Sequence, residues 1–398
     1  MWSGRHVVVG VSGGIASYKS CYLVRRLTEA GARVDVVLTS GAAEFVRPLT
    51  FEALSGRPVL TSLWDQGRAL DHVRLGQTSD LLIVAPATAN LIARVANGLA
   101  DDLLTSILLA ATRPILLAPA MNDAMYAAAA TRRNLSVLEG RGFALVGPEV
   151  GPLAEGPSDR PGRMSEPDTI LHHAARVIRR GGPLSGKRVV VTAGPTREAL
   201  DPVRFISNPS SGKMGFHLAQ AAWHRGAEVR LITGPTMQPL PVGPAVERVE
   251  TTAQLEQAVA SALPDADVLI MAAAPADYRP AERLEGKRPR SEGSLPVTLV
   301  PTDDILVATR ARRKPGSLVV GFALETGDGV ERARKKLARK ELDLIVVNDA
   351  LEPGAGFEVD TNRVSVLDRD GGRWDGPLAG KDEVAEQILD RVEARLGV

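Results

Sequence analysis

Glycines and small hydroxyl side chains cluster at two points where an apolar run ends. The first cluster, Ser12–Ser17 (SGGIAS), follows His6–Val11, and the second, Thr192–Thr196 (TAGPT), follows Arg188–Val191. Glycines let a phosphate group approach the backbone, and the N–H groups at the beginning of a following helix attract the anion. The two clusters predict two phosphate-binding sites, although a double glycine can also serve only to join a strand tightly to a helix.

A further segment, Ser210–Lys213 (SSGK), precedes a helical pattern and is superficially similar to a P-loop. The P-loop pattern GxxxxGK[ST] requires Ser or Thr after the lysine, whereas Met214 follows Lys213 here. The first cluster also lacks the GxGxxG spacing and the acidic residue of a standard NAD site. These patterns argue against a Walker-type ATPase and a standard dehydrogenase, and SSGKMG could be only the beginning of a helix.

The elements that must position these segments alternate regularly. Short apolar runs without period-2 alternation are typical of strands buried on both faces, and their alternation with helices predicts parallel, doubly wound sheets. The expected strands are His6–Val11, Arg33–Leu38, Asp80–Ala85, Pro114–Ala118, Arg188–Val191, Glu228–Thr233, Val268–Ala273, Leu318–Ala323, Leu344–Val347 and Arg363–Leu367. The expected helices are Ile15–Ala30, Asn90–Ala96, Leu103–Ala111, Asp168–Arg180, Lys213–Arg225, Gln254–Ala262, Val330–Lys340 and Asp382–Leu396.

Two domains are expected from the length of 398 residues. Gly181-Gly182-Pro183 ends a helical pattern and would make a linker, so the predicted domains are 1–183 and 184–398. Each is expected to be an α/β domain with a doubly wound, mainly parallel sheet, flavodoxin- or Rossmann-like. Within the first, Val150–Pro167 is rich in proline and glycine and is expected to be a functional loop or flap.

Composition excludes several other classes of protein. The formal net charge of +1 gives no electrostatic reason to expect a nucleic-acid or membrane partner. One cysteine, Cys21, cannot form an internal disulfide or a cysteine-rich zinc site. The apolar runs are too short to span a membrane, and the first expected strand leaves no room for a signal peptide. We therefore expect a cytoplasmic protein.

Six segments of the first half, in order, resemble the FMN-dependent cysteine decarboxylase family: GVSGGIASYK, LTSGAAEFV, DHVRL, APATAN, NGLADDLL and PAMNDAM. Loss of CO₂ from a C-terminal cysteine requires an electron sink, and FMN supplies that redox chemistry in the family. The resemblance implies an FMN site made of Ser12, Gly13, Gly14, Ser17, Thr39, Ser40, Pro86, Thr88 and Asn90.

Three catalytic assignments follow from the same resemblance. His72 is expected to act as an acid or base near the substrate thiol, and Asn122 to anchor the substrate carboxylate. The alternatives are a surface histidine and an asparagine that caps a helix. The family's flap carries a cysteine that is tied to reduction of an enethiol intermediate, where this chain has Glu155. A carboxyl group can also donate a proton, so Glu155 is a candidate for that role.

The second half resembles the phosphopantothenate–cysteine ligases that are fused to such decarboxylases in bifunctional coenzyme A biosynthesis proteins. The matching segments are AGPTREALDPVRFISNPSSGKMG, MAAAPADY, DDIL, GFALET and VND. The resemblance implies that the carboxylate of 4′-phosphopantothenate attacks the α-phosphate of CTP, with Mg²⁺ present and release of pyrophosphate. The amine of cysteine then displaces CMP from the acyl-cytidylate.

Roles for residues of the second half also follow from the resemblance. Lys287 would stabilise the triphosphate, and Asn208, with Arg204, would orient the acyl-cytidylate. Lys336 and Lys340 share one helix face, which could bind phosphates or be a solvated basic face. The implied CTP site comprises Met271, Ala272, Ala273, Asp277, Lys287, Asp303, Asp304, Ile305, Leu306, Phe322, Lys336 and Lys340, and the sequence leaves the Mg²⁺ ligands unassigned.

The expected partners are therefore small molecules: 4′-phosphopantothenate, cysteine and CTP. By analogy with the family we expect a homo-oligomer in which the first halves form trimers and the second halves form dimers, together a dodecamer. The leading hypothesis is an enzyme that makes 4′-phosphopantetheine. The alternative is an active ligase whose flavin half stops at the enethiol, or acts only as a flavin-binding scaffold.

Overall fold

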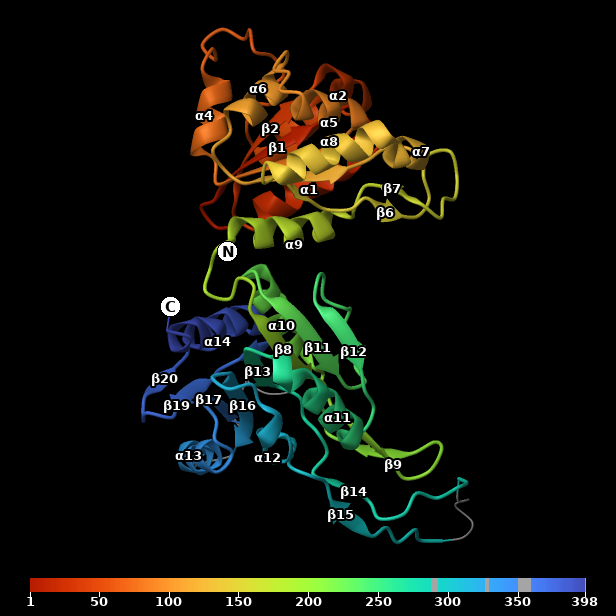
Figure 1. The fold of residues 1–398 in the computed structure, drawn as a ribbon, viewed down its shortest axis with the longest axis vertical. Coiled ribbons are helices and arrows are strands. Elements are labelled where there is room, and N and C mark those ends of the chain that lie inside the picture. Colours follow the sequence, from red (N-terminus) through yellow and green to blue (C-terminus); the bar gives the residue numbers. More distant parts are fainter. Residues whose placement is uncertain (288–292, 326–328, 350–358, 398) are drawn as a thin grey trace. The chain divides into compact units, whose positions relative to one another are not determined.

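The computed structural model describes residues 1–287, 293–325, 329–349 and 359–397 (Figure 1). Contacts divide the chain into two compact units, Met1–Arg179 and Arg180–Val398. The division falls just before Gly181-Gly182-Pro183, where the sequence predicts a linker. Residues 288–290, which follow Lys287 in the chain, and Thr326 of the GFALET segment lie outside the described residues.

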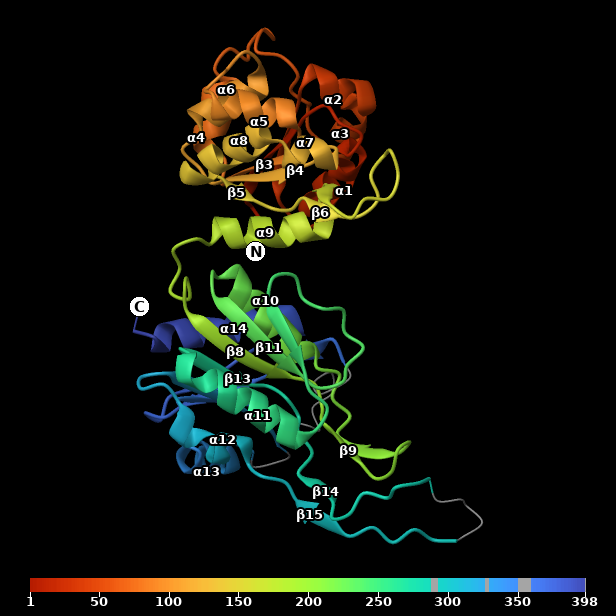
Figure 2. The ribbon, with the colours of Figure 1, turned by 45° about the vertical axis from the view of Figure 1, so that its right-hand side comes forward.

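The first unit contains a five-stranded, fully parallel sheet in the order β2-β1-β3-β4-β5. Helices cover both faces of it, with α1, α3 and α9 packed on one face and α4, α5, α6 and α8 on the other (Figures 1 and 2). A short hairpin, β6–β7, follows the sheet. The strands are β1 (His6–Val11), β2 (Arg33–Leu38), β3 (Leu81–Ala87), β4 (Ile115–Pro119), β5 (Ala144–Leu145), β6 (Glu149–Val150) and β7 (Pro161–Arg163). The helices are α1 (Ser17–Glu29), α2 (Ser40–Phe45), α3 (Pro48–Ser55), α4 (Asp71–Thr78), α5 (Ala89–Ala96), α6 (Leu103–Ala110), α7 (Asp123–Ala127), α8 (Ala129–Gly140) and α9 (Pro167–Ile178).

The second unit contains an eight-stranded sheet in the order β12-β11-β8-β13-β16-β17-β19-β20. The first six strands in this order, β12, β11, β8, β13, β16 and β17, are parallel to one another. Strands β19 and β20 add an antiparallel edge. The strand that the sequence predicts at Arg363–Leu367 is β19, which begins at Ser365 and is antiparallel to β17. The sheet strands are β8 (Arg188–Ala193), β11 (Glu228–Thr233), β12 (Ala245–Arg248), β13 (Val268–Met271), β16 (Leu318–Glu325), β17 (Leu344–Asp349), β19 (Ser365–Asp368) and β20 (Arg373–Asp375).

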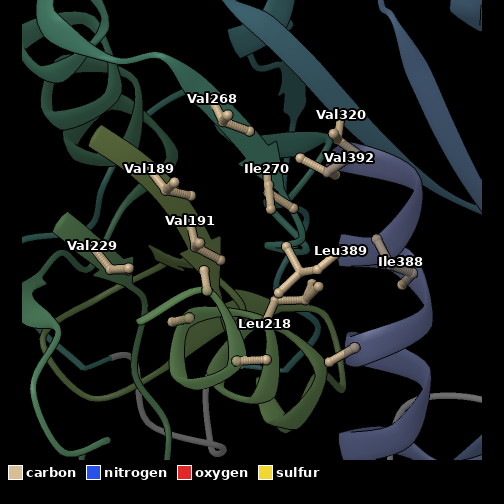
Figure 3. Close-up of a cluster of buried hydrophobic side chains, with 14 of the residues drawn as sticks. Val189, Val191, Leu218, Val229, Val268, Ile270, Val320, Ile388, Leu389 and Val392 are labelled. Carbon is tan, nitrogen blue, oxygen red and sulfur yellow. The ribbon is translucent and has the colours of Figure 1, made fainter. Parts of the chain in front are cut away.

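Helices cover both faces of this sheet as well. Helices α10 and α14 pack on one face, and Figure 3 shows Leu218 of α10 and Leu389 of α14 beside Val191 and Ile270 of the sheet. Helices α11, α12 and α13 pack on the other face. The α-helices are α10 (Lys213–His224), α11 (Thr252–Ala262), α12 (Ile305–Ala308), α13 (Gly329–Arg339) and α14 (Lys381–Arg395).

Short elements outside the large sheet join its strands to one another. The ribbon formed by β14 and β15 extends away from the sheet in both views (Figures 1 and 2). Two 3₁₀ turns, η1 and η3, follow α11 and α12. The short strands are β9 (Arg197–Ala199), β10 (Phe205–Ser207), β14 (Tyr278–Pro280), β15 (Leu299–Pro301), β18 (Thr361–Asn362) and β21 (Ala379–Gly380), and the turns are η1 (Leu263–Asp265) and η3 (Arg310–Arg312).

Two doubly wound, mainly parallel sheets were expected, and this prediction of the fold is confirmed. The strand order of the first sheet is the flavodoxin-like order 2-1-3-4-5. When the six parallel strands of the second sheet are numbered along the chain, their order is the Rossmann order 3-2-1-4-5-6. Among the described residues, no helix is long and apolar enough to cross a membrane.

A buried ion cluster joins the first two strands of the first unit. His6 Nε2 lies 2.8 Å from Asp35 Oδ2, and Arg57 Nε donates to Asp35 Oδ1 at 2.6 Å. Burial alone would raise the pKa of Asp35, but hydrogen bonds from His6 and Arg57 outweigh it and lower this pKa to about 2. A carboxylate with a depressed pKa stabilises the fold above its unfolded value and loses that contribution as the pH falls.

We predict that Asp35→Asn lowers the stability of the first unit by about 2 kcal/mol at neutral pH, the linkage equivalent of this depression. Hydrogen-exchange protection of the β1 and β2 amides should fall about 30-fold. The difference from wild type should shrink between about pH 4 and pH 2, as Asp35 itself becomes protonated. The exposed Asp65→Asn serves as a control. Equal protection in wild type and Asp35→Asn at pH 7 would contradict this prediction.

Candidate active sites

The first candidate site is a cavity of about 760 Å³ at the carboxyl ends of the parallel strands. Ligands of open α/β sheets bind where the strand order reverses, which in this order is between β1 and β3. The volume lies within the range of about 300–1,000 Å³ that is typical of small-molecule sites. Residues of the expected FMN and catalytic sets that line it are Ser12, Gly13, Gly14, Thr39, Ser40, Thr88, Asn90, Asn122 and Glu155.

Hydrogen bonds tie the loop after β1 to the loop after β3. Ser12 Oγ donates to the carbonyl of Pro86 at 2.8 Å and lies 3.0 Å from Thr88 Oγ1. Close packing against the loop after β2 also requires a glycine, because a Cβ on Gly13 would lie 2.7 Å from the carbonyl carbon of Gly41. The loop then enters α1, whose N-cap makes no side-chain hydrogen bond. Small residues and a helix N-terminus fit the phosphate of a flavin nucleotide.

Two residues of the expected FMN set support the loop without lining the cavity. Ser17 is fully buried, and its Oγ donates to the carbonyls of Ser12 and Gly14 at 3.1 and 2.7 Å. Pro86 is also buried, and its carbonyl accepts from Ser12. In the structure of one chain, both residues hold the loop in shape. The sequence could not separate loop supports from ligand contacts, because both lie within the same motif.

The β6–β7 hairpin brings Glu155 to Asn122. Asn122 Oδ1 accepts from the N–H groups of Ala124 and Met125 at 2.9 and 3.3 Å, so the residue does cap α7. Its Nδ2 donates to Glu155 Oε1. The hairpin is held over this region by Ser158 Oγ, which donates to Asp123 Oδ2 at 2.7 Å. Helix capping and a position in the cavity are therefore compatible.

His72 lies outside the lining of this cavity. It is the second residue of α4, a helix that packs against α6, and its side chain is half-buried. Its Nδ1 is buried and has no hydrogen-bond partner among the residues that the structure describes. One chain thus brings Asn122 and Glu155 together but does not bring His72 to them.

The second candidate site is a cavity of about 490 Å³ at the carboxyl edge of the second sheet. It lies where the strand order reverses between β8 and β13, the position of nucleotides in Rossmann-like sheets. Eleven of the twelve residues expected to bind CTP line it: Met271, Ala272, Ala273, Asp277, Asp303, Asp304, Ile305, Leu306, Phe322, Lys336 and Lys340. Asn208 lines it as well.

Carboxylates hold two lysines in place: Lys336 of α13, and Lys340, which follows the last residue of that helix. Lys336 Nζ donates to Glu325 Oε1 at 2.6 Å, and Lys340 Nζ lies 3.0 Å from Asp304 Oδ2. Burial would raise the pKa of Glu325, but hydrogen bonds from Lys336 and Arg332 outweigh it and lower this pKa. The two lysines are therefore oriented at the cavity rather than free on a solvated basic face.

The three expected ligase catalytic residues are placed differently. Asn208 Nδ2 donates to the carbonyls of Ala274 and Pro275 at 3.3 and 2.9 Å, which fixes its carboxamide at the cavity wall. Arg204 does not line the cavity, because its Nε donates at 2.6 Å to buried Asp201 and stabilises a local turn.

Lys287 lies outside this cavity too. It is exposed in the segment between β14 and β15, which leaves the sheet. The predicted proximity of Arg204 and Lys287 to the nucleotide is therefore not seen within one chain.

Residues that the sequence did not assign to a site also line the two cavities. In the first unit, Lys19 is buried and its Nζ donates to Glu166 at 2.9 Å. In the second unit, Lys213, Asn362 and Lys381 line the second cavity. Lys213 was visible in the SSGK segment, whereas Lys381 carried no motif. Among the described residues, no group of three or more His, Cys, Asp or Glu side chains is placed to hold a metal ion.

Comparison with known proteins adds to this geometry. The family model "Flavoprotein" matches residues 1–179, and the model "DNA/pantothenate metabolism flavoprotein C-terminal domain" matches residues 184–396. The chain is similar to the coenzyme A biosynthesis bifunctional protein CoaBC of Bacillus subtilis (strain 168), with 45% identity over 99% of this chain and 98% of that one. For CoaBC of Escherichia coli (strain K12) the identity is 44% over the same shares of the two chains.

A solved structure of the C-terminal domain of a CoaBC protein is 39% identical, covers 55% of this chain and 99% of that one, and has a TM-score of 0.47. Family models together cover both units, and curated relatives match over nearly their whole length. The chain therefore belongs to the CoaBC family of bifunctional coenzyme A biosynthesis proteins.

Proposed function

We propose that this chain condenses 4′-phosphopantothenate with cysteine in a reaction that cleaves CTP to CMP and pyrophosphate. It then decarboxylates 4′-phosphopantothenoylcysteine to 4′-phosphopantetheine. The observation that carries the proposal is the gathering of eleven expected CTP residues at one cavity, in a chain that matches CoaBC over 99% of its length. We assign the ligase to the second unit and the decarboxylase to the first. A cytoplasmic location suits a chain with one cysteine and phosphorylated substrates.

For the ligase, we assign the meeting point of the two substrates to Asn208. The nucleotide cavity lies on one side of the segment 208–211, and a larger depression of about 1320 Å³ shares Asn208, Ser210 and Ser211 with it. An extended acyl substrate in the depression would meet the α-phosphate of CTP at this shared wall. Since Asn208 Nδ2 is held by two carbonyls, its Oδ1 remains to accept a hydrogen bond from the attacking amine. Mg²⁺ would bind mainly through the phosphates.

For the decarboxylase, bound FMN supplies the oxidation and reduction that loss of CO₂ requires. The chain's own groups bind the substrate and move protons. Asn122 Nδ2 donates to the carboxylate of Glu155 in this structure, and we propose that the substrate carboxylate takes that place. Glu155, displaced on the hairpin, then stays beside the substrate as a proton donor for the reduction step.

We further propose that other copies of the chain complete both sites. His72 and Lys287 each lie outside the cavity they are expected to serve. Exposed apolar side chains lie close to both in sequence: Trp64 and Leu70 near His72, and Tyr278 near Lys287, at 88%, 73% and 54% exposure. Such residues are typical of interfaces. These exposed residues support a homo-oligomer. By analogy with the family, we propose that the first units form trimers and the second units form dimers, which together build a dodecamer.

Glu155→Gln should leave loss of CO₂ largely intact but slow the reduction at least tenfold, because an amide cannot supply the proton. Mass spectrometry of the product should then show a species two hydrogens lighter than 4′-phosphopantetheine. Asp159→Asn, an exposed acidic position of the same hairpin, is the matched control. Complete reduction at the wild-type rate by Glu155→Gln would exclude Glu155 as the donor.

Asn208→Ala should separate the two ligase steps. With CTP, 4′-phosphopantothenate and Mg²⁺, a first turnover of pyrophosphate release should persist, while amide formation with cysteine falls about 100-fold because the acyl-cytidylate is no longer oriented. Rapid-quench measurement of pyrophosphate and amide gives both rates. Failure of the wild-type chain to release pyrophosphate from CTP would refute the ligase assignment itself.

Co-expression of His72→Ala and Asn122→Ala chains should restore decarboxylation to about a quarter of the wild-type rate, the share of sites that receive both intact residues from different copies. Each variant alone should be nearly inactive. Analytical ultracentrifugation of the hybrids measures the assembly. Persistent inactivity of hybrids that assemble normally would place His72 and Asn122 of one site in the same chain.

A further inference from the structure

Among the residues that the structure describes, four lysines line the nucleotide cavity, and they come from the two helical layers of the second unit. Lys336 and Lys340 belong to the layer of α11, α12 and α13, and each is held by a carboxylate. Lys213 and Lys381 begin α10 and α14, which form the opposite layer. The cavity is therefore flanked by one pair of lysines from each face of the sheet.

Lys381 is held in surroundings that disfavour its charge. Its exposed fraction is only 4%, although it lines the cavity. Burial lowers the pKa of Lys381, the charge of Lys213 lowers it further, and Asp360 acts in the opposite direction. Asp360 pairs with Lys213 but does not line the cavity. Lys213 and Lys381 therefore bring two ammonium groups to the same cavity, while Asp360, the counter-ion of Lys213, lies outside its lining.

The packing of α10 against α14 keeps these two lysines together. Figure 3 shows Leu218 of α10 beside Leu389 of α14 in the core of the unit. At the end of α10, buried Arg225 donates to Glu386, Asp390 and Glu393 of α14 at 2.6 to 2.7 Å. Two residues that are 168 positions apart in the chain are thus fixed as one pair by apolar contacts and an ion cluster.

We propose that Lys213 and Lys381 form the binding site for the terminal phosphates of the nucleoside triphosphate, and that they hold the departing pyrophosphate. This inference rests on the CTP-dependent ligation proposed above. Two ammonium groups at one wall of a cavity can donate charge-assisted hydrogen bonds to the oxygens of a polyanion. The apolar wall of the same cavity, with Phe322 and Met271, suits the nucleoside instead. The SSGK segment thus does bind phosphate, with Lys381 as the second cation instead of a P-loop hydroxyl.

The proposal predicts that removing either lysine weakens nucleotide binding by an amount that depends on how many phosphates the nucleotide carries. Lys213→Met and Lys381→Met should each weaken CTP binding about tenfold, the usual weight of one charge-assisted hydrogen bond. Binding of CMP, which lacks the terminal phosphates, should change less than twofold. Titration calorimetry of the full chain with CTP and Mg²⁺, and separately with CMP, measures both. In steady state, KM for CTP should rise while KM for cysteine stays constant.

The control is Lys335→Met, since Lys335 is exposed on α13 and does not line the cavity. Unchanged CMP binding also shows that each variant has folded, and Lys213→Arg should recover most of the CTP affinity. Equal weakening of CTP and CMP, or normal CTP binding in both methionine variants, would overturn the role of the pair. A wild-type chain that fails to bind CTP at all would instead remove the proposed ligase function.

Discussion

Both candidate sites depend on the reversal of strand order within a parallel sheet. At such a point the chain leaves two adjacent strands toward opposite faces, so their following loops part and leave a crevice at the carboxyl edge. The strands themselves are covered by helices on both sides and are largely apolar, as β3 is throughout and β1 is beyond His6. His6 and Asp35 form a buried pair within the sheet, whereas the polar groups of the first site come from the segments that follow the strands. Ser12 Oγ donates to the carbonyl of Pro86 and accepts from the N–H of Thr88, and these two hydrogen bonds bridge that crevice and fix the shape of the first cavity.

This constraint explains why much of the fold could be predicted from the sequence. His6–Val11, Arg33–Leu38 and Glu228–Thr233 are buried runs of β-branched residues, and the structure gives each strand the predicted bounds. Polar or short elements had no such signal. The strand Ala245–Arg248 has no fully buried residue, and the strands Arg197–Ala199 and Tyr278–Pro280 each have only one. Helices that begin with proline or follow irregular loops, such as Pro48–Ser55 and Asp71–Thr78, were also missed.

Site residues divide in the same way. Predicted residues at or next to a strand end, such as Thr88 and Met271, do line the cavities, because the motif and the carboxyl edge of the sheet coincide. Residues that depend on tertiary packing were not predicted. Lys381 reaches the nucleotide cavity only because α14 packs on α10, a contact between segments far apart in the chain. Conversely, Arg204 is adjacent in sequence to the expected site but is engaged by Asp201, three residues before it.

Ion pairs with carboxylates allow several lysines to lie close together at the second cavity without destabilising the fold. Glu325 is 9% exposed and anchored between Lys336 and Arg332, whereas Lys336 keeps 41% of its side chain exposed. Because its ammonium group is partly solvated, Lys336 is the partner in this pair that can turn toward a phosphate. Glu325 keeps Arg332 as its partner when this happens, and no buried carboxylate is left unpaired. In the proposed function, the carboxylates therefore hold the lysines in position for the nucleotide.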